Sequence, residues 1–305
     1  MAESEEKAGH SAEYFGETRD YWYEPDFVAL MARRWRLGEC HAALDVGSGI
    51  GHWGRLLAPH LATDARLVGV ERDPQWVAEA TKRAAAAGLG ARCSYQVGDA
   101  LALPVQGGTF DLVTCQTVLI HIADVRAALR EMVRALAPGG LLAVAEPNNV
   151  SVALVQGSAT FDDPIDTVVD LARFQLTCER GKVALGEGNN SIGDLVPGYF
   201  AEVGLEDITV FLSDKAELLL PPYASREQRA RTAETLEWAG RGFWIWDEAD
   251  TARFFLAGGG TQAELARLWA LAMERTARVA AAIRKGTWHE AGARTTYLIA
   301  GRKPR

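Results

Sequence analysis

Residues 44–54 read LDVGSGIGHWG and place four glycines directly behind a short apolar run. Glycine is favoured where a chain turns sharply or where a ligand touches bare backbone. A dinucleotide-binding loop would read G-x-G-x-x-G, but His52 stands where its third glycine belongs, and a phosphate-binding loop would need a lysine that this stretch lacks. The stretch therefore predicts a strand and a loop that approaches a ligand closely, with no phosphate signature.

On the C-terminal side of this stretch, apolar strand-like runs alternate with helical patterns. Val-, Leu- and Ala-rich runs at 66–71, 93–97, 110–119 and 141–147 are separated by helical patterns at 52–61, 75–88 and 124–136. This alternation is typical of a parallel sheet that is covered on both faces. Right-handed crossovers then predict an α/β fold with a doubly wound, mostly parallel sheet.

Composition narrows the class of protein. The chain has 305 residues, 48% of them hydrophobic, and a formal net charge of −8 without a dense basic run, so nucleic acid is not an expected partner. No apolar run approaches the roughly 20 residues that span a bilayer, and the acidic N-terminal stretch has no apolar signal core. We expect a cytoplasmic protein with no membrane contact, as a monomer or homodimer. Its four cysteines, none in a C-x-x-C pair, are expected to be buried free thiols.

Acidic side chains follow the first three predicted strands. Asp45 precedes the glycine loop, Glu71 ends the second strand, and Asp99 follows the third. In an open α/β sheet, ligands bind beyond the carboxyl ends of the strands, where these groups meet. A carboxylate at the second strand can accept both hydroxyls of a ribose.

In their order and spacing along the chain, these motifs resemble those of the class I S-adenosylmethionine-dependent methyltransferases, of the small-molecule type with a UbiE-like core. The resemblance is carried by LDVGSGIG, GVERD, VGDALALP, FDLVTCQTVLIHI and VRALAPGGLLAVAEP, and more weakly by SIGDLVPGYFAEVGLEDITV. It implies a seven-stranded Rossmann-like sheet and S-adenosyl-L-methionine as cofactor, with S-adenosyl-L-homocysteine as product. It also implies a cofactor site, formed by Tyr21, Asp45, Gly47, Ser48, Gly49, Glu71, Arg72, Gly98, Asp99, Ala100, Gln116, Thr117 and Val118.

The family core usually has a short hairpin between its last two strands, whereas about 80 residues intervene here, at 215–294. We interpret 1–36 as N-terminal gate helices and 37–214 plus 295–305 as the cofactor-binding core, with a helical insertion at 150–190. Residues 215–294 are interpreted as a helical lid.

Methyl transfer needs a base only when the attacking atom carries a proton. His121 and His289 are the candidate bases, and His52 is expected to pack or cap. Candidate acceptor-binding residues are aromatic or polar: Tyr14, Trp22, His121, Asn148, Asn149, Phe243, Trp244 and Trp246. No metal is expected, because Gln116 and His121 stand where catechol-type relatives have an acid.

We therefore predict methyl transfer to an oxygen or nitrogen atom of a small molecule by in-line displacement. A NAD-dependent oxidoreductase, a non-catalytic S-adenosylmethionine-binding protein, and a methyltransferase that acts on protein or RNA remain the alternatives.

Overall fold

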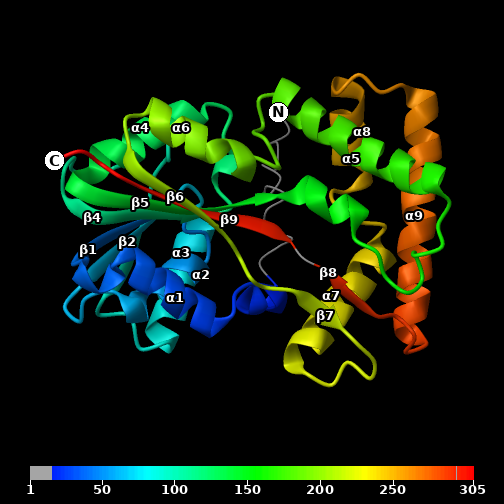
Figure 1. The fold of residues 1–305 in the computed structure, drawn as a ribbon, viewed down its shortest axis with the longest axis horizontal. Helices are drawn as coiled ribbons and strands as arrows, with labels where there is room; N and C mark the ends of the chain where they lie inside the picture. Colours follow the sequence, from blue (N-terminus) through cyan, green and yellow to red (C-terminus); the bar gives the residue numbers. More distant parts are fainter. Residues whose placement is uncertain (1–15, 293) are drawn as a thin grey trace, which may run out of the picture.

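A seven-stranded sheet forms the centre of the computed structural model, which describes residues 16–292 and 294–305 (Figure 1). Its strand order is β3-β2-β1-β4-β5-β9-β6, and β9 is antiparallel to both of its neighbours. The strands are β1 (Ala42–Val46), β2 (Arg66–Glu71), β3 (Cys93–Val97), β4 (Phe110–Gln116), β5 (Leu136–Asn148), β6 (Glu206–Leu212) and β9 (Thr295–Arg302). The predicted fold class, a doubly wound and mostly parallel sheet, is confirmed.

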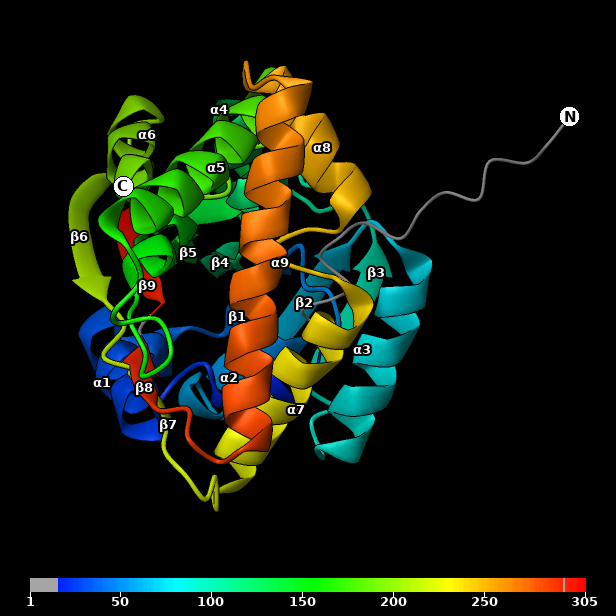
Figure 2. The ribbon, with the colours of Figure 1, turned by 90° about the vertical axis from the view of Figure 1, so that its right-hand side faces the viewer.

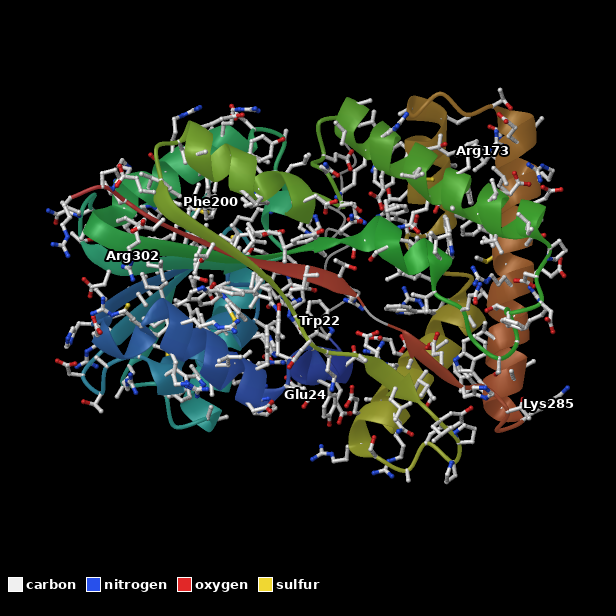
Figure 3. All side chains as sticks on the ribbon, in the orientation of Figure 1. Trp22, Glu24, Arg173, Phe200, Lys285 and Arg302 are labelled. Carbon is white, nitrogen blue, oxygen red and sulfur yellow. The ribbon has the colours of Figure 1, made fainter. Side chains whose placement is uncertain are left out.

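Helices cover both faces of this sheet. On one face lie α1 (Pro25–Trp35), α2 (His52–Leu57) and α3 (Pro74–Ala86), and on the other lie α4 (Val125–Ala135) and α6 (Val196–Glu202). Each face has its own apolar cluster; Trp35 and Leu57 belong to the first, and Met132 and Phe200 to the second. Figure 3 shows Phe200 between α6 and the sheet. Because β1, β4 and β5 are buried on both faces, they read as continuous apolar runs.

The N-terminal segment consists of two parts with different positions, which the sequence did not predict. Within 1–36, helix α1 buries Phe27, Met31 and Trp35 in the core of the sheet, so α1 is not a gate. Among the described residues of this segment, the 3₁₀ turn Glu17–Tyr21 and Trp22, labelled in Figure 3, lie between the core and the cap: Thr18 bonds Glu234 of α7 and Arg19 bonds Gln116 of β4.

The cap is built from two segments of the chain. Helices α7 (Arg226–Arg241), α8 (Glu248–Ala257) and α9 (Gln262–Arg284) come from the predicted lid, and the short strands β7 (Glu217–Leu219) and β8 (Glu290–Gly292) pair at its base. Helix α5 (Ile165–Ala184), expected from the sequence within a core insertion, packs against α8 and α9 (Figure 2). Phe174 of α5 stacks on Trp244 at 4.8 Å between ring centroids. The segment 150–190 therefore contributes to the cap.

Candidate functional site

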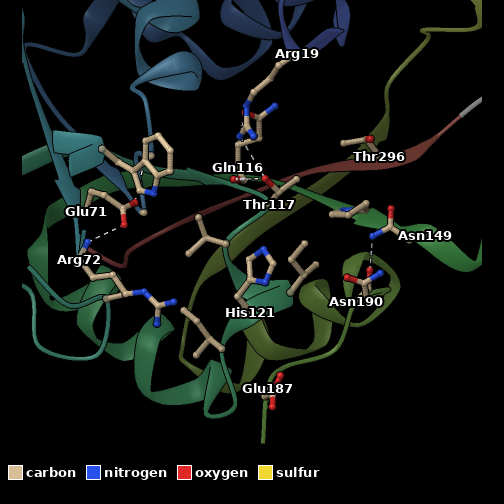
Figure 4. A pocket seen from close by; sticks show the side chains of 18 of the residues that line it. Arg19, Glu71, Arg72, Gln116, Thr117, His121, Asn149, Glu187, Asn190 and Thr296 are labelled. Atoms are coloured by element: carbon tan, nitrogen blue, oxygen red, sulfur yellow. Dashed lines mark hydrogen bonds between the residues drawn. The ribbon is translucent and has the colours of Figure 1, made fainter. Parts of the chain in front are cut away.

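A cavity of about 790 Å³ lies between the carboxyl ends of the parallel strands and the cap. Figure 4 shows Glu71 and Arg72 at one end, Asn149 and Asn190 at the other, and His121 between them. A cavity of this size is typical of small-molecule sites, which occur where the strand order of an α/β sheet reverses. In this sheet the order reverses between β1 and β4.

The glycine loop after β1 forms one wall of the cavity. Gly47 and Gly49 line it, with φ angles of 63° and 51°. A Cβ atom on Gly47 would lie 2.6 Å from Cγ2 of Val118, so a side chain there would require the loop after β4 to move. Asp45 lies beneath the loop and accepts a hydrogen bond from the Gly54 N–H at 3.0 Å, which joins β1 to α2. Burial raises the pKa of Asp45 to about 7.

Glu71 is held in a fixed position at the end of β2. Its Oε2 accepts the Gly49 N–H at 2.9 Å, and its Oε1 accepts the N–H groups of Arg72 at 2.9 Å and Asp73 at 3.2 Å. A carboxylate offers about four acceptor positions, so Oε2 retains one for a ligand. Glu71 therefore fixes the glycine loop and presents an acceptor to the cavity.

The end of β3 continues this half of the cavity. Gly98, Asp99 and Ala100 line it, and Asp99 Oδ1 accepts the N–H of Leu101 at 2.8 Å. This turn orients the Asp99 carboxylate toward the same space as Glu71, where its second oxygen can accept a hydrogen bond from a ligand.

The loop after β4 carries His121 and is held by hydrogen bonds from β5 of the sheet and from α5 of the cap. Thr117 adopts φ 54°, an uncommon conformation for a β-branched residue. Glu146 at the end of β5 accepts the N–H groups of Val118 and Leu119 at 2.9 and 3.0 Å. Lys182 of α5, itself fully buried, donates to the Ile120 carbonyl at 2.8 Å. This bond ties a cap helix to the loop that positions His121 in the cavity.

A buried polar cluster lies above the end of β4. Nη2 of Arg19 donates to Gln116 Oε1 at 3.3 Å, and Gln116 Nε2 donates to the Tyr23 hydroxyl at 3.1 Å. Burial lowers the pKa of Arg19 to about 10 and raises that of Tyr23 to about 12. His52 is buried beside this cluster, and desolvation lowers its pKa to about 3, which agrees with a packing role.

Aromatic and amide side chains complete the lining of the cavity. Trp22, Trp238 and Trp244 are the tryptophans on or near the cap that line it. Asn149 Nδ2 donates to the Asn190 carbonyl at 2.6 Å, and these two residues form the polar end in Figure 4.

Most residues that the sequence assigned to the cofactor line the cavity. These are Gly47, Gly49, Glu71, Arg72, Gly98, Asp99, Ala100, Gln116, Thr117 and Val118. Of the expected acceptor residues, Trp22, His121, Asn149, Trp244 and Trp246 line it as well, although Trp246 is only 1% exposed and packs mainly inside the cap.

Other expected site residues lie outside the cavity. The Tyr21 hydroxyl contacts Glu17, the Asn148 amide donates to Asp194, and Phe243 packs against Trp238 inside the cap. His289 is exposed directly before β8, where its backbone N–H donates to the Ser158 hydroxyl at 3.0 Å, and it does not line the cavity. Asp45 and Ser48 lie beneath the glycine loop rather than on its cavity side. Tyr14 falls outside the described residues.

Sequence reasoning missed several cavity residues on segments distant in the chain. They are Arg19, Tyr23, Trp76, Gln175, Glu187, Asn190, Trp238, Arg294 and Thr296. Several of them, Gln175 and Trp238 among them, belong to the cap, whose docking periodicity does not report. For Trp76 the signal was present, since it stands on the first turn of α3 directly after the Glu71 motif.

Within 16–292 and 294–305, no group of three or more His, Cys, Asp or Glu side chains is placed to hold a metal ion. Among the helices described, none combines the length and apolar character that crossing a bilayer requires.

Comparisons with known proteins agree with this geometry. A family model described as a methyltransferase domain matches residues 43–140. The methyltransferase GfsG of Streptomyces halstedii is 31% identical over 157 residues, 46% of this chain and 56% of that protein. The demethylmenaquinone methyltransferase of Thermus thermophilus is 41% identical over 103 residues, 34% of this chain and 46% of that protein. The chain thus spans about half the length of these curated relatives.

Solved structures show the same fold at low sequence identity. YcgJ of Bacillus subtilis aligns with 92% of this chain and 100% of its own, with a TM-score of 0.50 and 18% identity. A Bacillus halodurans protein described as a methyltransferase aligns with the same shares, with a TM-score of 0.52 and 17% identity. The glycine loop, the carboxylate at β2 and the matched family model lead to one conclusion: residues 43–140 of this chain form a methyltransferase domain of the class I S-adenosylmethionine-dependent type.

Proposed function

We propose that this protein transfers a methyl group from S-adenosylmethionine to an oxygen or nitrogen atom of a small molecule in the cavity. The observation that carries the proposal is Glu71, held by three backbone N–H groups beside the glycine loop and facing the cavity. The same end of the cavity holds the side chains that a nucleoside needs, and the opposite end is formed by the cap.

The residues present fit the cofactor. Glu71 retains an acceptor position for a ribose hydroxyl, and the free oxygen of Asp99 suits an adenine amino group. Gly47 and Gly49 let the methionine portion approach the backbone. Arg19, next to Gln116, supplies a cation for the methionine carboxylate.

When bound, the sulfonium supplies an activated methyl group and leaves as a neutral thioether, so no acid is needed at the leaving group. The protein has to align the acceptor and exclude water, and orientation contributes roughly 7–11 kcal/mol to such reactions. His121 lies between the two ends of the cavity and is the base we assign for an acceptor that carries a proton.

The cap covers the cavity, and this enclosure favours a small molecule over a polymer as the methyl acceptor. Trp238 and Trp244 of the cap line the cavity together with the strand ends, and the cavity volume suits a ligand of drug size beside the cofactor. The cytoplasmic location and the choice between monomer and homodimer stay predictions from the sequence.

Two experiments test the proposal. Equilibrium binding should show that S-adenosylhomocysteine binds at least tenfold more tightly than NAD; a preference for NAD would support the oxidoreductase alternative. Single-turnover transfer of a labelled methyl group to a panel of metabolites should then yield a methylated product. Tight cofactor binding without product across the panel would favour a non-catalytic binding protein.

A further inference from the structure

Arg294 is a cation that lines the cavity and has no role in the proposed function as stated so far. It lies between β8 and β9 and lines the cavity, with its guanidinium stacked on the Trp22 ring at 4.6 Å. Apart from this stacking, it makes no hydrogen bond or ion pair with any residue in 16–292 or 294–305. A guanidinium that faces a ligand cavity with its donors unused has the geometry to bind an oxyanion.

A second cation lies close to Arg294. The Arg19 guanidinium stacks on the same Trp22 ring at 4.8 Å, and the positive charge of Arg294 contributes to lowering the pKa of Arg19. Two like charges held this close repel each other, and an anion bound between or beside them would relieve that repulsion.

The carboxylates that line the cavity already have partners. Glu71 accepts backbone N–H groups, Asp73 caps α3 through the Gln75 N–H, and Asp99 accepts the Leu101 N–H. Glu187 pairs with Arg253. None of them contacts Arg294. Glu234 of α7, outside the cavity lining, is attracted to Arg294 but accepts its hydrogen bond from Thr18. The donors of Arg294 are therefore available to an anionic ligand.

The sheet order separates Arg294 from the cofactor end. The glycine loop follows β1, whereas Arg294 leads into β9, three strands further along the order β1-β4-β5-β9. At about 4.8 Å per strand, this places the start of β9 about 14 Å from the end of β1. Arg19 lies over β4, nearer the methionine end, so Arg294 faces the acceptor half.

The walls around Arg294 favour a flat ligand. Trp22, Trp238 and Trp244 line the same cavity, Trp22 stacks directly on Arg294, and indole rings bind planar groups by stacking. Resting on the proposed function, we infer that the acceptor is a planar aromatic molecule with a carboxylate, and that Arg294 binds this carboxylate.

The test uses the full chain saturated with S-adenosylhomocysteine. Benzoate, indole-3-carboxylate and anthraquinone-2-carboxylate are titrated by tryptophan fluorescence, each beside its primary amide. We expect at least one acid to bind about tenfold or more tightly than its amide, since a hydrogen bond to a charged group is lost in the amide. Arg294→Gln should weaken that acid about 10- to 100-fold and leave the amide unchanged, and Arg294→Lys should fall between.

Arg284→Gln, an exposed arginine at the end of α9, serves as the matched control and should bind like the wild type. Equal binding of acids and amides, or no binding of any acid, would overturn the inference. So would an Arg294→Gln protein that loses affinity for S-adenosylhomocysteine instead, because Arg294 would then belong to the cofactor site. Failure of the wild type to bind S-adenosylhomocysteine at all would refute the proposed function itself.

Discussion

Removing the Glu71 carboxylate should weaken cofactor binding, and the structure allows an estimate of how much the dissociation constant rises. Glu71 joins the Gly49 loop to the end of β2 and leaves one acceptor position for a ribose hydroxyl. A hydrogen bond to a charged group contributes about 1.5–3 kcal/mol, so Glu71→Ala should raise the dissociation constant of S-adenosylhomocysteine about 10- to 150-fold. Glu71→Gln keeps one acceptor oxygen and should have a smaller effect.

Isothermal titration calorimetry measures this directly, with thermal unfolding as a check that the variants fold. Glu202→Gln is a matched control, because Glu202 lies on α6, is exposed, and pairs with Arg126 away from the cavity. A Glu71→Ala protein that folds and binds S-adenosylhomocysteine within threefold of the wild type would refute the ribose assignment.

Three further perturbations test other parts of the site. With a hydroxyl acceptor, His121→Ala should lower the single-turnover rate about 10²- to 10⁴-fold while leaving the dissociation constant of S-adenosylhomocysteine unchanged; an unaltered rate would remove His121 as the base. Burial raises the pKa of Glu146 from 4.5 to about 7, so this group stays protonated in the native state where it ionises in the unfolded state, and its contribution to stability should fall by about 3 kcal/mol between pH 4.5 and 7. Glu146→Gln lacks this titration, so its free energy of unfolding in urea should fall less over the same range, and an identical fall in both proteins would contradict the burial of the charge. Gly47→Ala should abolish cofactor binding and cost more stability than Gly88→Ala, because both glycines have positive φ but only Gly47 has a neighbour, Val118, at 2.6 Å; equal losses would show that the contact with Val118 does not matter.

The sheet was predictable because its signal is local. Strands β1 and β4 are short, mostly apolar runs, and the glycine loop follows β1, Glu71 ends β2, and Asp99 lies two residues after β3. Parallel topology then brings these ends to one edge, so residues far apart in sequence could be assigned to one site without a structure.

The cap was less predictable because its position depends on packing between distant segments. Helix α5 shows only a weak division into apolar and polar faces, since one side packs on α8 and α9 while Ile165 and Val169 remain exposed on another. Periodicity therefore identified the helix but not its partners, and the segment was assigned to the core. Arg294 and His289 illustrate the same limit, because they lie five residues apart in the sequence and only Arg294 lines the cavity.

The most direct test of the central claim is a crystal structure of the complex with S-adenosylhomocysteine. The account predicts ribose hydroxyls within hydrogen-bonding distance of Glu71, adenine beside Asp99, and the sulfur directed toward the space in front of His121. Nucleoside density elsewhere on the molecule, or ribose that leaves Glu71 without contact, would contradict it.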